Sequence, residues 1–256
     1  MDDRSRRNID GRNTVNIIYS GTRNLYPAMR GAILSLLDHN PAARITVLAE
    51  DDRLPFEIPA EHRIINVSGQ AVFPPDGPNM KNQFTYMAMM RSVTADLLPE
   101  EDRVIQLDVD TIVCDDLTPM WEIDLEDKWL AWCQERWGAW KPYGPAYYNF
   151  GVAVLNLAQM RKDRAPEILS SLLNLQAYPY VDQDVMNLLA VPNKTVDLPV
   201  RYNESFCCGY TENPAIVHYA GYPEWYTVDY CPRWWLREKY KRKADEVFGP
   251  GTGVIG

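Results

Sequence analysis

The chain has 256 residues, 46% of them hydrophobic, and a formal net charge of −9. This length and apolar content allow one large domain or two small ones with a real core. The acidic balance argues against nucleic acid as a partner, and no apolar stretch is long enough to cross a membrane.

The cysteines and the first residues indicate a compartment. The five cysteines form no Cys-x-x-Cys zinc pattern, and the adjacent pair Cys207 and Cys208 suits neither a disulfide framework nor a metal knuckle. The first residues do not resemble the start of a signal peptide. We therefore expect a cytoplasmic protein whose cysteines act as small apolar residues.

The first third of the chain alternates strands and helices. Residues 1–13 are polar without an apolar period and predict a flexible tail. Short β-branched runs predict buried strands at residues 15–19, 45–48 and 63–67. Between the first two strands, an apolar face at helical spacing predicts a helix over residues 26–39. This order of elements predicts a parallel sheet in an α/β fold.

The later elements follow from the same periods. We expect helices over residues 84–98, 168–175, 185–189 and 234–243, and strands over residues 104–113, 129–133, 150–157 and 216–219. Residues 135–148 are rich in Trp, Tyr, Gly and Pro and predict a loop. Its rings either form a platform for a sugar or seal the core. The chain shows neither an internal repeat nor a clear linker, so we expect a single domain.

Two aspartates, Asp108 and Asp110, interrupt the apolar run 104–113. Aspartate is depleted in strands, and alternate residues of an extended chain face the same side. The two carboxylates therefore point together and repel each other unless a cation lies between them. Such hard oxygen ligands suit Mg²⁺, Mn²⁺ or Ca²⁺ at the end of a central strand. The alternative is a pair of solvated aspartates at a strand-to-loop corner.

Six blocks occur in an order that is informative as a set. They are Asn24 after the opening strand, Arg91 upstream of the central strand, Leu107-Asp108-Val109-Asp110, Tyr148-Asn149-Phe150-Gly151-Val152, Asp182-Gln183-Asp184 and His218-Tyr219-Ala220-Gly221. Asp-x-Asp alone is a weak signal, but the whole set is specific. Over roughly residues 15–235 the chain resembles glycosyltransferase family 8, the glycogenin-like and bacterial lipopolysaccharide glucosyl- and galactosyltransferases.

The resemblance implies a GT-A fold, which is a Rossmann-like, mostly parallel sheet flanked by helices, in one domain over residues 14–235. It implies a retaining, metal-dependent transfer of a hexose, glucose or galactose, from a UDP-sugar to an acceptor hydroxyl. The acceptor would be a glycan, a lipid-linked sugar or a protein. Since no carboxylate nucleophile is obvious, front-face attack by the acceptor is favoured over a covalent intermediate.

The resemblance also assigns roles to individual residues. Asp108, Asp110 and His218 would hold Mn²⁺, or Mg²⁺, which would bridge the diphosphate. The residues that would bind the donor are Asn24, Arg91, Asp108, Asn149, Asp182 and Gln183. Of these, Asp182 and Gln183 would be catalytic, with Gln183 nearest the anomeric carbon. Taken singly, several have plainer explanations: His218 as a core histidine, Gln183 as a helix cap and Arg91 as a surface ion pair.

Two positions depart from the family pattern. The family has a lysine bound to the diphosphate three residues after the glycine of His-x-x-Gly, where this chain has Glu224. A carboxylate there would repel the diphosphate. Either Lys141, Arg233 or Arg23 substitutes for the lysine, or the loop is shifted, or this chain turns over slowly. Thr22 stands where an acidic residue is common in the family, which weakens the inference that the base is uracil.

Two other functions fit part of the sequence. A haloacid dehalogenase-type phosphatase also has an Asp-x-Asp-Thr motif like residues 108–111 after an apolar run. That function would leave Asn149 and His218 without a role. A non-catalytic nucleotide-sugar or glycan-binding module is the other alternative, because Glu224 would weaken the grip on a diphosphate.

The end of the chain combines tryptophans with a dense basic run over residues 233–243. Trp mixed with Lys and Arg suits a membrane interface, so weak peripheral contact with anionic lipid would serve a lipid-linked acceptor. The alternative is a helix that packs its tryptophans on the domain and solvates its lysines. We expect residues 236–256 to form this basic helix and a frayed, Gly-rich tail.

Overall fold

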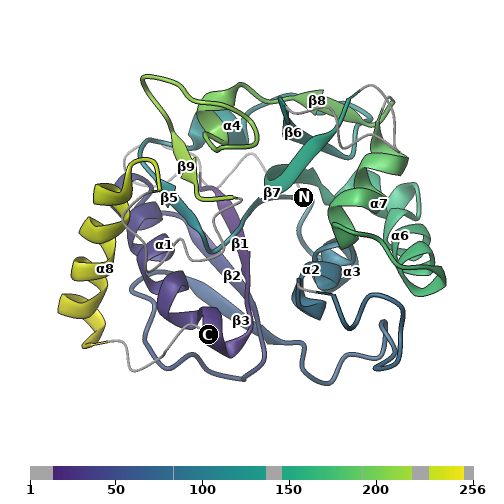
Figure 1. Ribbon diagram of the computed structural model, residues 1–256, viewed down its shortest axis with the longest axis horizontal. Helices are drawn as coiled ribbons and strands as arrows, with labels where there is room; N and C mark the ends of the chain where they lie inside the picture. The colour runs from purple at the N-terminus through teal and green to yellow at the C-terminus, as the bar shows by residue number, and fades with distance from the viewer. Residues whose placement is uncertain (1–13, 83, 137–145, 192, 221–230, 251–256) are drawn as a thin grey trace.

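A seven-stranded sheet forms the centre of the protein (Figure 1). The computed structural model describes residues 14–82, 84–136, 146–191, 193–220 and 231–250. In sheet order the strands are β3 (His62–Asn66), β2 (Arg44–Ala49), β1 (Asn16–Ser20), β4 (Arg103–Leu107), β7 (Tyr148–Asn156), β6 (Leu130–Gln134) and β8 (Thr195–Asp197). A separate two-stranded sheet pairs β5 (Thr111–Val113) with β9 (Ile216–His218).

Among the described strands of the large sheet, β7 alone runs against the others. Strands β1 to β4 are parallel, β7 is antiparallel to both of its neighbours, and β6 is parallel to β8. The mostly parallel α/β sheet expected from the sequence is therefore confirmed. Because β7 is reversed, its first half meets the ends of β4 and β6: Leu107 pairs with Val152, and Gln134 pairs with Tyr148. This edge carries the site described below.

Apolar layers cover both faces of the sheet. Ile17 of β1 packs in the same layer as Met29 of α1 (Tyr26–His39), whereas Ile18 packs into the opposite layer. The helices of that opposite layer are α2 (Tyr86–Arg91), α3 (Thr94–Leu97), α5 (Leu157–Lys162), α6 (Ala165–Leu175) and α7 (Val181–Ala190). Burying one aliphatic side chain contributes roughly 1.5–3 kcal/mol, so these layers hold the sheet edge firmly.

Helix α8 (Trp234–Phe248) packs against α1 on the outside of the molecule (Figure 1). Its buried residues are Arg237, Tyr240 and Ala244. Trp234 and Trp235 at its start are 42% and 54% exposed, so the domain covers them only in part. None of the described helices is long and apolar enough to cross a membrane. The expected flexible tail 1–13, and residues 251–256 at the end of the expected Gly-rich tail, lie outside the described residues.

The strand expected over residues 104–113 is broken at its two aspartates. Strand β4 ends at Leu107, and β5 begins at Thr111 in the other sheet. The hydroxyl of Thr111 donates to the carbonyl oxygen of Asp108 at 2.7 Å and closes the turn between the two strands. Asp108 and Asp110 therefore flank a turn. The sequence-based prediction that they alternate along one extended strand is wrong.

The helix expected over residues 84–98 is also broken. Helix α2 ends at Arg91, and α3 begins at Thr94. The hydroxyls of Ser92 and Thr94 donate back to the carbonyl oxygens of Met89 and Arg91, at 2.7 and 2.8 Å, and compete with helical hydrogen bonding. Short elements that the sequence did not predict include α5, β8, and the 3₁₀ turns η2 (Arg23–Leu25) and η3 (Val200–Tyr202). Most of the aromatic loop expected at 135–148 lies outside the described residues.

Candidate active site

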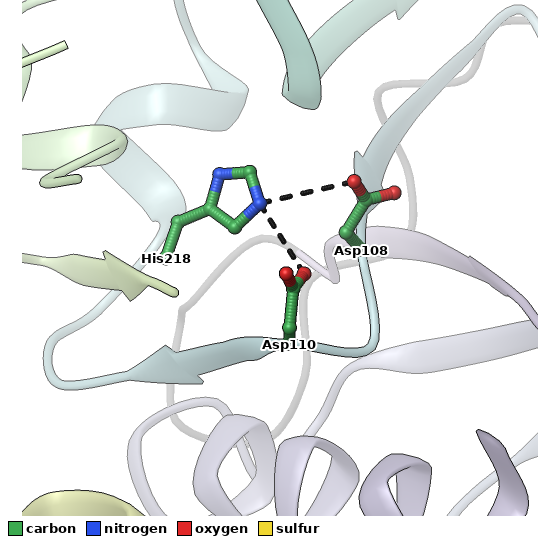
Figure 2. A group of neighbouring side chains, drawn as sticks. All are labelled: Asp108, Asp110 and His218. Carbon is green, nitrogen blue, oxygen red and sulfur yellow. Dashed lines mark ion pairs between the residues drawn. The ribbon is translucent and has the colours of Figure 1, made fainter. Parts of the chain in front are cut away.

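Three side chains from two sheets meet where β4 ends. Asp108 follows β4, Asp110 precedes β5, and His218 ends β9, the partner of β5. Nε2 of His218 lies 3.2 Å from Oδ1 of Asp110 and 3.8 Å from Oδ2 of Asp108 (Figure 2). One ligand atom from each residue lies within 4.8 Å of the other two. The fold thus brings together the three residues that the resemblance assigns to a metal.

Gly151 leaves open the space in which these ligand atoms meet. It lies on β7, and its carbonyl oxygen accepts a hydrogen bond from the backbone N–H of Asp108 at 2.7 Å. A Cβ atom on it would lie 2.2 Å from Cε1 of His218 and 2.6 Å from Oδ2 of Asp108. Only a residue without a side chain allows this close approach. Two carboxylates and an imidazole nitrogen around this space suit a divalent cation such as Mn²⁺.

The charges around this space favour a cation. Burial raises the pKa of Asp108, and Asp110 raises it further, although Arg91 opposes the shift. Burial alone would lower the pKa of His218, but the carboxylates of Asp110 and Asp108 outweigh it and raise that pKa. The cluster therefore attracts protons, and a divalent cation would replace them on the same atoms.

Arg91 joins this cluster to Asp182. The Arg91 guanidinium lies over the ring of Phe150, 5.4 Å from the ring centre. Its Nε and Nη2 donate to the two carboxylate oxygens of Asp182 at 2.8 and 3.1 Å, while Nη1 contacts Oδ1 of Asp108. Arg91 therefore reaches into the site as a charge-assisted link between two carboxylates. Burial raises the pKa of Asp182 to about 6, against the opposing effect of Arg91.

The first turn of α7 aims Asp182 and Gln183 at the sheet edge. Val181, its first residue, has a φ of 47°, a left-handed value that β-branched residues rarely adopt. Asp184 fixes the turn, because its carboxylate accepts hydrogen bonds from the Tyr180 N–H at 2.8 Å and the Tyr147 hydroxyl at 2.5 Å. Local backbone strain of this kind clusters at functional sites.

Asn149 and Gln183 lie side by side, and the protein orients both amide groups. Oδ1 of Asn149 accepts from the N–H of Gly151 at 3.1 Å, and its Nδ2 donates to Oε1 of Gln183 at 3.3 Å. Oε1 of Gln183 also accepts from the N–H of Phe150 at 2.9 Å, and its Nε2 donates to the Tyr147 hydroxyl at 3.1 Å. The structure thus brings both predicted residues to the site in fixed orientations.

Glu135 is a buried carboxylate of this site that the sequence analysis does not identify. It directly follows β6, is 8% exposed, and accepts from the side-chain nitrogens of Asn149 and Gln183, each at 3.3 Å. Burial raises the pKa of Glu135. A carboxylate directly after a buried strand is the same signal that marks Asp108, but here the aromatic stretch that follows obscures it.

Asn24 makes no described contact with this cluster. It is exposed on η2, just after β1, and its Oδ1 accepts a hydrogen bond from the Thr22 hydroxyl. Strands β1 and β4 are parallel neighbours, so Asn24 and Asp108 follow strands that end at the same edge of the sheet. Contact between Asn24 and a nucleoside stays a prediction.

Two of the cations considered in place of the missing family lysine are paired elsewhere. Arg233 contacts both carboxylate oxygens of the buried Glu204, and Arg23 pairs with Asp51 at 2.7 Å. Lys141, the third, lies outside the described residues, as does the position of the missing lysine. These two ion pairs would have to open before either arginine could reach a diphosphate.

Comparison with known proteins gives one family. The model of glycosyl transferase family 8 matches residues 16–224. The chain is 29% identical over 127 residues to a probable glycosyl transferase, Gly, of Streptococcus gordonii, and 27% identical over 153 residues to glycosyltransferase GlyA of Streptococcus pneumoniae. These matches cover 49% and 56% of this chain but 18% and 22% of the two relatives. The matched region thus spans about a fifth of the length of these curated relatives.

A solved structure shares the fold. Galactosyltransferase LgtC, crystallised with donor and acceptor sugar analogues, superposes on this chain with a TM-score of 0.72 at 20% identity. The match covers 94% of this chain and 97% of that one. The GT-A fold expected from the sequence is therefore confirmed.

Proposed function

Because this chain belongs to glycosyl transferase family 8, we propose that it is a retaining, metal-dependent hexosyltransferase. The hexose would be glucose or galactose, carried by UDP and transferred to an acceptor hydroxyl. The observation that carries the proposal is the convergence of Asp108, Asp110 and His218 on one space. That space lies at the carboxyl ends of parallel strands, where open α/β sheets bind nucleotides.

Asp108, Asp110 and His218 would hold the cation, with Mn²⁺ expected and Mg²⁺ as the alternative. When bound, the cation would neutralise negative charge that develops on the diphosphate leaving group. Arg91 would add a second positive charge beside it, since its guanidinium is held between Asp108 and Asp182. A charge fixed in advance in a buried site needs little reorganisation when the bond to the sugar breaks.

Asp182 and Gln183 would act on the donor sugar. Retention through a covalent intermediate needs a carboxylate that is free to attack the anomeric carbon. Asp182 is held through both oxygens by Arg91, and Oε1 of Glu135 accepts from two amide groups. These contacts favour front-face attack. The acceptor oxygen would bond to the anomeric carbon as the bond to the diphosphate breaks, and the acceptor proton would pass to the leaving group.

Membership of the family removes the haloacid dehalogenase-type phosphatase from consideration. A non-catalytic nucleotide-sugar or glycan-binding module is the second candidate. Glu224 stands where the family has a diphosphate-binding lysine, and Arg23 and Arg233 are engaged by Asp51 and Glu204. A binding module would tolerate weaker binding of the diphosphate group more readily than an enzyme would.

The acceptor would be a glycan, a lipid-linked sugar or a protein in the cytoplasm. Exposure of Trp234 and Trp235 at the start of α8 supports weak peripheral contact with an anionic membrane. The net charge of −9 does not favour nucleic acid as a partner.

Donor hydrolysis separates the enzyme from the binding module. The chain would be incubated with a panel of nucleotide sugars that includes UDP-glucose and UDP-galactose, with either Mn²⁺ or EDTA, and the released nucleotide measured. A hexosyltransferase should release UDP slowly into water with Mn²⁺ and not with EDTA. Binding of a nucleotide sugar without release of nucleotide under any of these conditions would identify a binding module.

A further inference from the structure

Asn203 fixes the far side of the His218 ring. Nδ1 of His218 lies 2.8 Å from Oδ1 of Asn203, and Nδ2 of Asn203 donates to Oδ1 of Asn149 at 2.9 Å. Asn203 is 0% exposed and His218 is 3% exposed, so bulk water does not compete for these hydrogen bonds. We refer to His218, Asn203 and Asn149 as the amide relay.

The backbone N–H of Gly151, at the Asn149 end of the amide relay, determines the direction of each hydrogen bond in it. The backbone N–H of Gly151 can only donate, so the Asn149 atom that it contacts is the carbonyl oxygen. Asn203 contacts the same oxygen, so it must turn its NH₂ group to Asn149 and its oxygen to His218. An amide oxygen can only accept, and therefore Nδ1 of His218 carries a proton.

The other end of Asn149 gives the same orientation. Its second polar atom contacts Oε1 of Gln183, which accepts from the backbone N–H of Phe150 at 2.9 Å and must be an oxygen. The Asn149 atom that faces it is therefore the nitrogen. Two independent backbone N–H groups thus determine how the amide relay is oriented.

Backbone pairing holds both members of the Asn203–His218 contact. Asn203 directly follows η3, and its N–H donates to the carbonyl oxygen of Val200, the first residue of that turn, at 2.9 Å. The next residue is Glu204. Its backbone carbonyl oxygen accepts from the N–H of His218 at 2.8 Å, and its backbone N–H donates to the carbonyl oxygen of Ile216 at 3.0 Å. The segment that carries Asn203 is therefore joined to the strand that carries His218.

We propose that Asn203 is a positioning residue of the metal site, which holds His218 in the tautomer that presents an unprotonated Nε2 to a divalent cation. This inference rests on the proposed function, since it requires that a cation binds between Asp108, Asp110 and His218. Without Asn203, the proton of the neutral ring could move to Nε2, where Asp110 lies 3.2 Å away as an acceptor. That nitrogen could not then bind a metal.

Two substitutions separate this role from simple packing. Asn203→Ala removes the acceptor for the Nδ1 proton. Asn203→Asp keeps an oxygen that accepts this hydrogen bond and loses the NH₂ group that donates to Asn149, so it separates the two contacts of Asn203. Asn79→Ala is the matched control. Asn79 is 1% exposed and donates to the carbonyl oxygen of Leu173, at 2.6 Å, near the end of α6. It reports the general cost of losing a buried asparagine.

Mn²⁺ affinity and ring protonation are the two readouts. Free Mn²⁺ is followed by its electron paramagnetic resonance signal during titration of each folded variant. The ring ¹⁵N shifts of the metal-free protein are followed as the pH is raised until the His218 ring has lost one proton, because the neighbouring carboxylates raise the pKa of this histidine. The chain has three histidines, and His218→Gln assigns the signal of interest.

Wild type, Asn203→Asp and Asn79→Ala should bind Mn²⁺ with similar affinity, and the wild-type ring should carry its proton on Nδ1. Asn203→Ala should bind Mn²⁺ about 10- to 100-fold more weakly, the usual cost of removing the hydrogen-bond partner of a metal-binding histidine, and its His218 ring should gain the Nε2–H form. Equal Mn²⁺ affinity of wild type and Asn203→Ala would overturn the positioning role and leave the metal site standing.

A proton on Nε2 in the wild type would overturn the positioning role as well, and this readout decides the matter if Asn203→Ala does not fold. Failure of the wild type to bind Mn²⁺ would be a different result. It would remove the metal site itself, and with it both this inference and the metal dependence of the proposed function.

Discussion

Gly151 lies so close to His218 that a Cβ atom on it would come within 2.2 Å of the imidazole Cε1. The two residues belong to different sheets, since Gly151 is on β7 and His218 is on β9. At this contact, His218 of the two-stranded sheet lies beside the two aspartates that follow the central strand β4. The geometry of the candidate metal site therefore depends on the absence of a side chain at Gly151.

Gly151→Ala should weaken Mn²⁺ binding by at least about 10-fold, because the added methyl group would displace Asp108 and His218. Overpacking of this kind also lowers the free energy of unfolding by about 1–3 kcal/mol. Calorimetric titration with Mn²⁺ measures the first effect and urea denaturation the second. Gly69→Ala is the control, because a Cβ atom there would meet nothing within 4 Å. Undiminished Mn²⁺ affinity in folded Gly151→Ala would contradict the proposed convergence of ligands.

Asp182→Asn and Gln183→Ala should each lower kcat by about 100-fold and change the affinity for the donor far less. Asparagine can accept from Arg91 through one oxygen where Asp182 uses two, so the guanidinium loses its fixed orientation. Steady-state kinetics and donor titration measure the two quantities separately. The control is Asp127→Asn, at a carboxylate side chain that is 63% exposed. If donor affinity fell while kcat held, these residues would bind the donor without acting in the transition state.

The metal-free protein should lose stability as the pH rises from about 4 to about 6, through Asp182. Burial raises the pKa of this carboxyl from 3.8 to about 6, so the folded state keeps a proton that the unfolded chain has released. Where the folded state binds more protons, the free energy of unfolding falls with rising pH. Urea denaturation at several pH values should show this loss in wild type relative to Asp182→Asn, which has no such proton. A pH-independent difference between the two would contradict the assignment.

Membrane contact through α8 can be tested without removing the helix. Truncation after Pro232 would uncover the α1 surface that Tyr240 and Ala244 bury, so point substitutions are preferable. Trp234→Ala combined with Trp235→Ala should reduce co-sedimentation with anionic vesicles several-fold, because these exposed rings would enter the interface. Leu175→Ala, at a residue 75% exposed on α6, is the control. Equal sedimentation of all three proteins would leave a soluble acceptor as the default.

Local sequence signals predict those parts of the fold that local interactions decide. Helix α1 spans Tyr26–His39 as predicted, because its apolar face and its end are encoded within a single segment. The break between β4 and β5 is not local. Strand β5 pairs with β9, where Thr111 lies opposite His218. The partner of β5 is thus more than a hundred residues later in the chain, and β5 belongs to a separate sheet. Periodicity carries no information about that partner.

The candidate site shows the same division. Asp108 and Asp110 stand out as charges inside an apolar run, whereas His218 could be placed beside them only through the family resemblance. Neither the local sequence pattern nor the family resemblance identifies Glu135 or Asn203. Asn203 acquires its role from an amide of β7 and an imidazole of β9, and no local pattern around it indicates either partner.

The central claim is that Asp108, Asp110 and His218 hold the divalent cation on which sugar transfer depends. The most direct test is nucleotide release from UDP-glucose and UDP-galactose, measured with Mn²⁺ and with EDTA for wild type, Asp108→Asn, Asp110→Asn and the control Asp127→Asn. Wild type and the control should be active with Mn²⁺ alone, and the two site variants should be inactive in both conditions, since each loses a charged ligand. Activity that persists undiminished in EDTA, or in both site variants, would contradict the account.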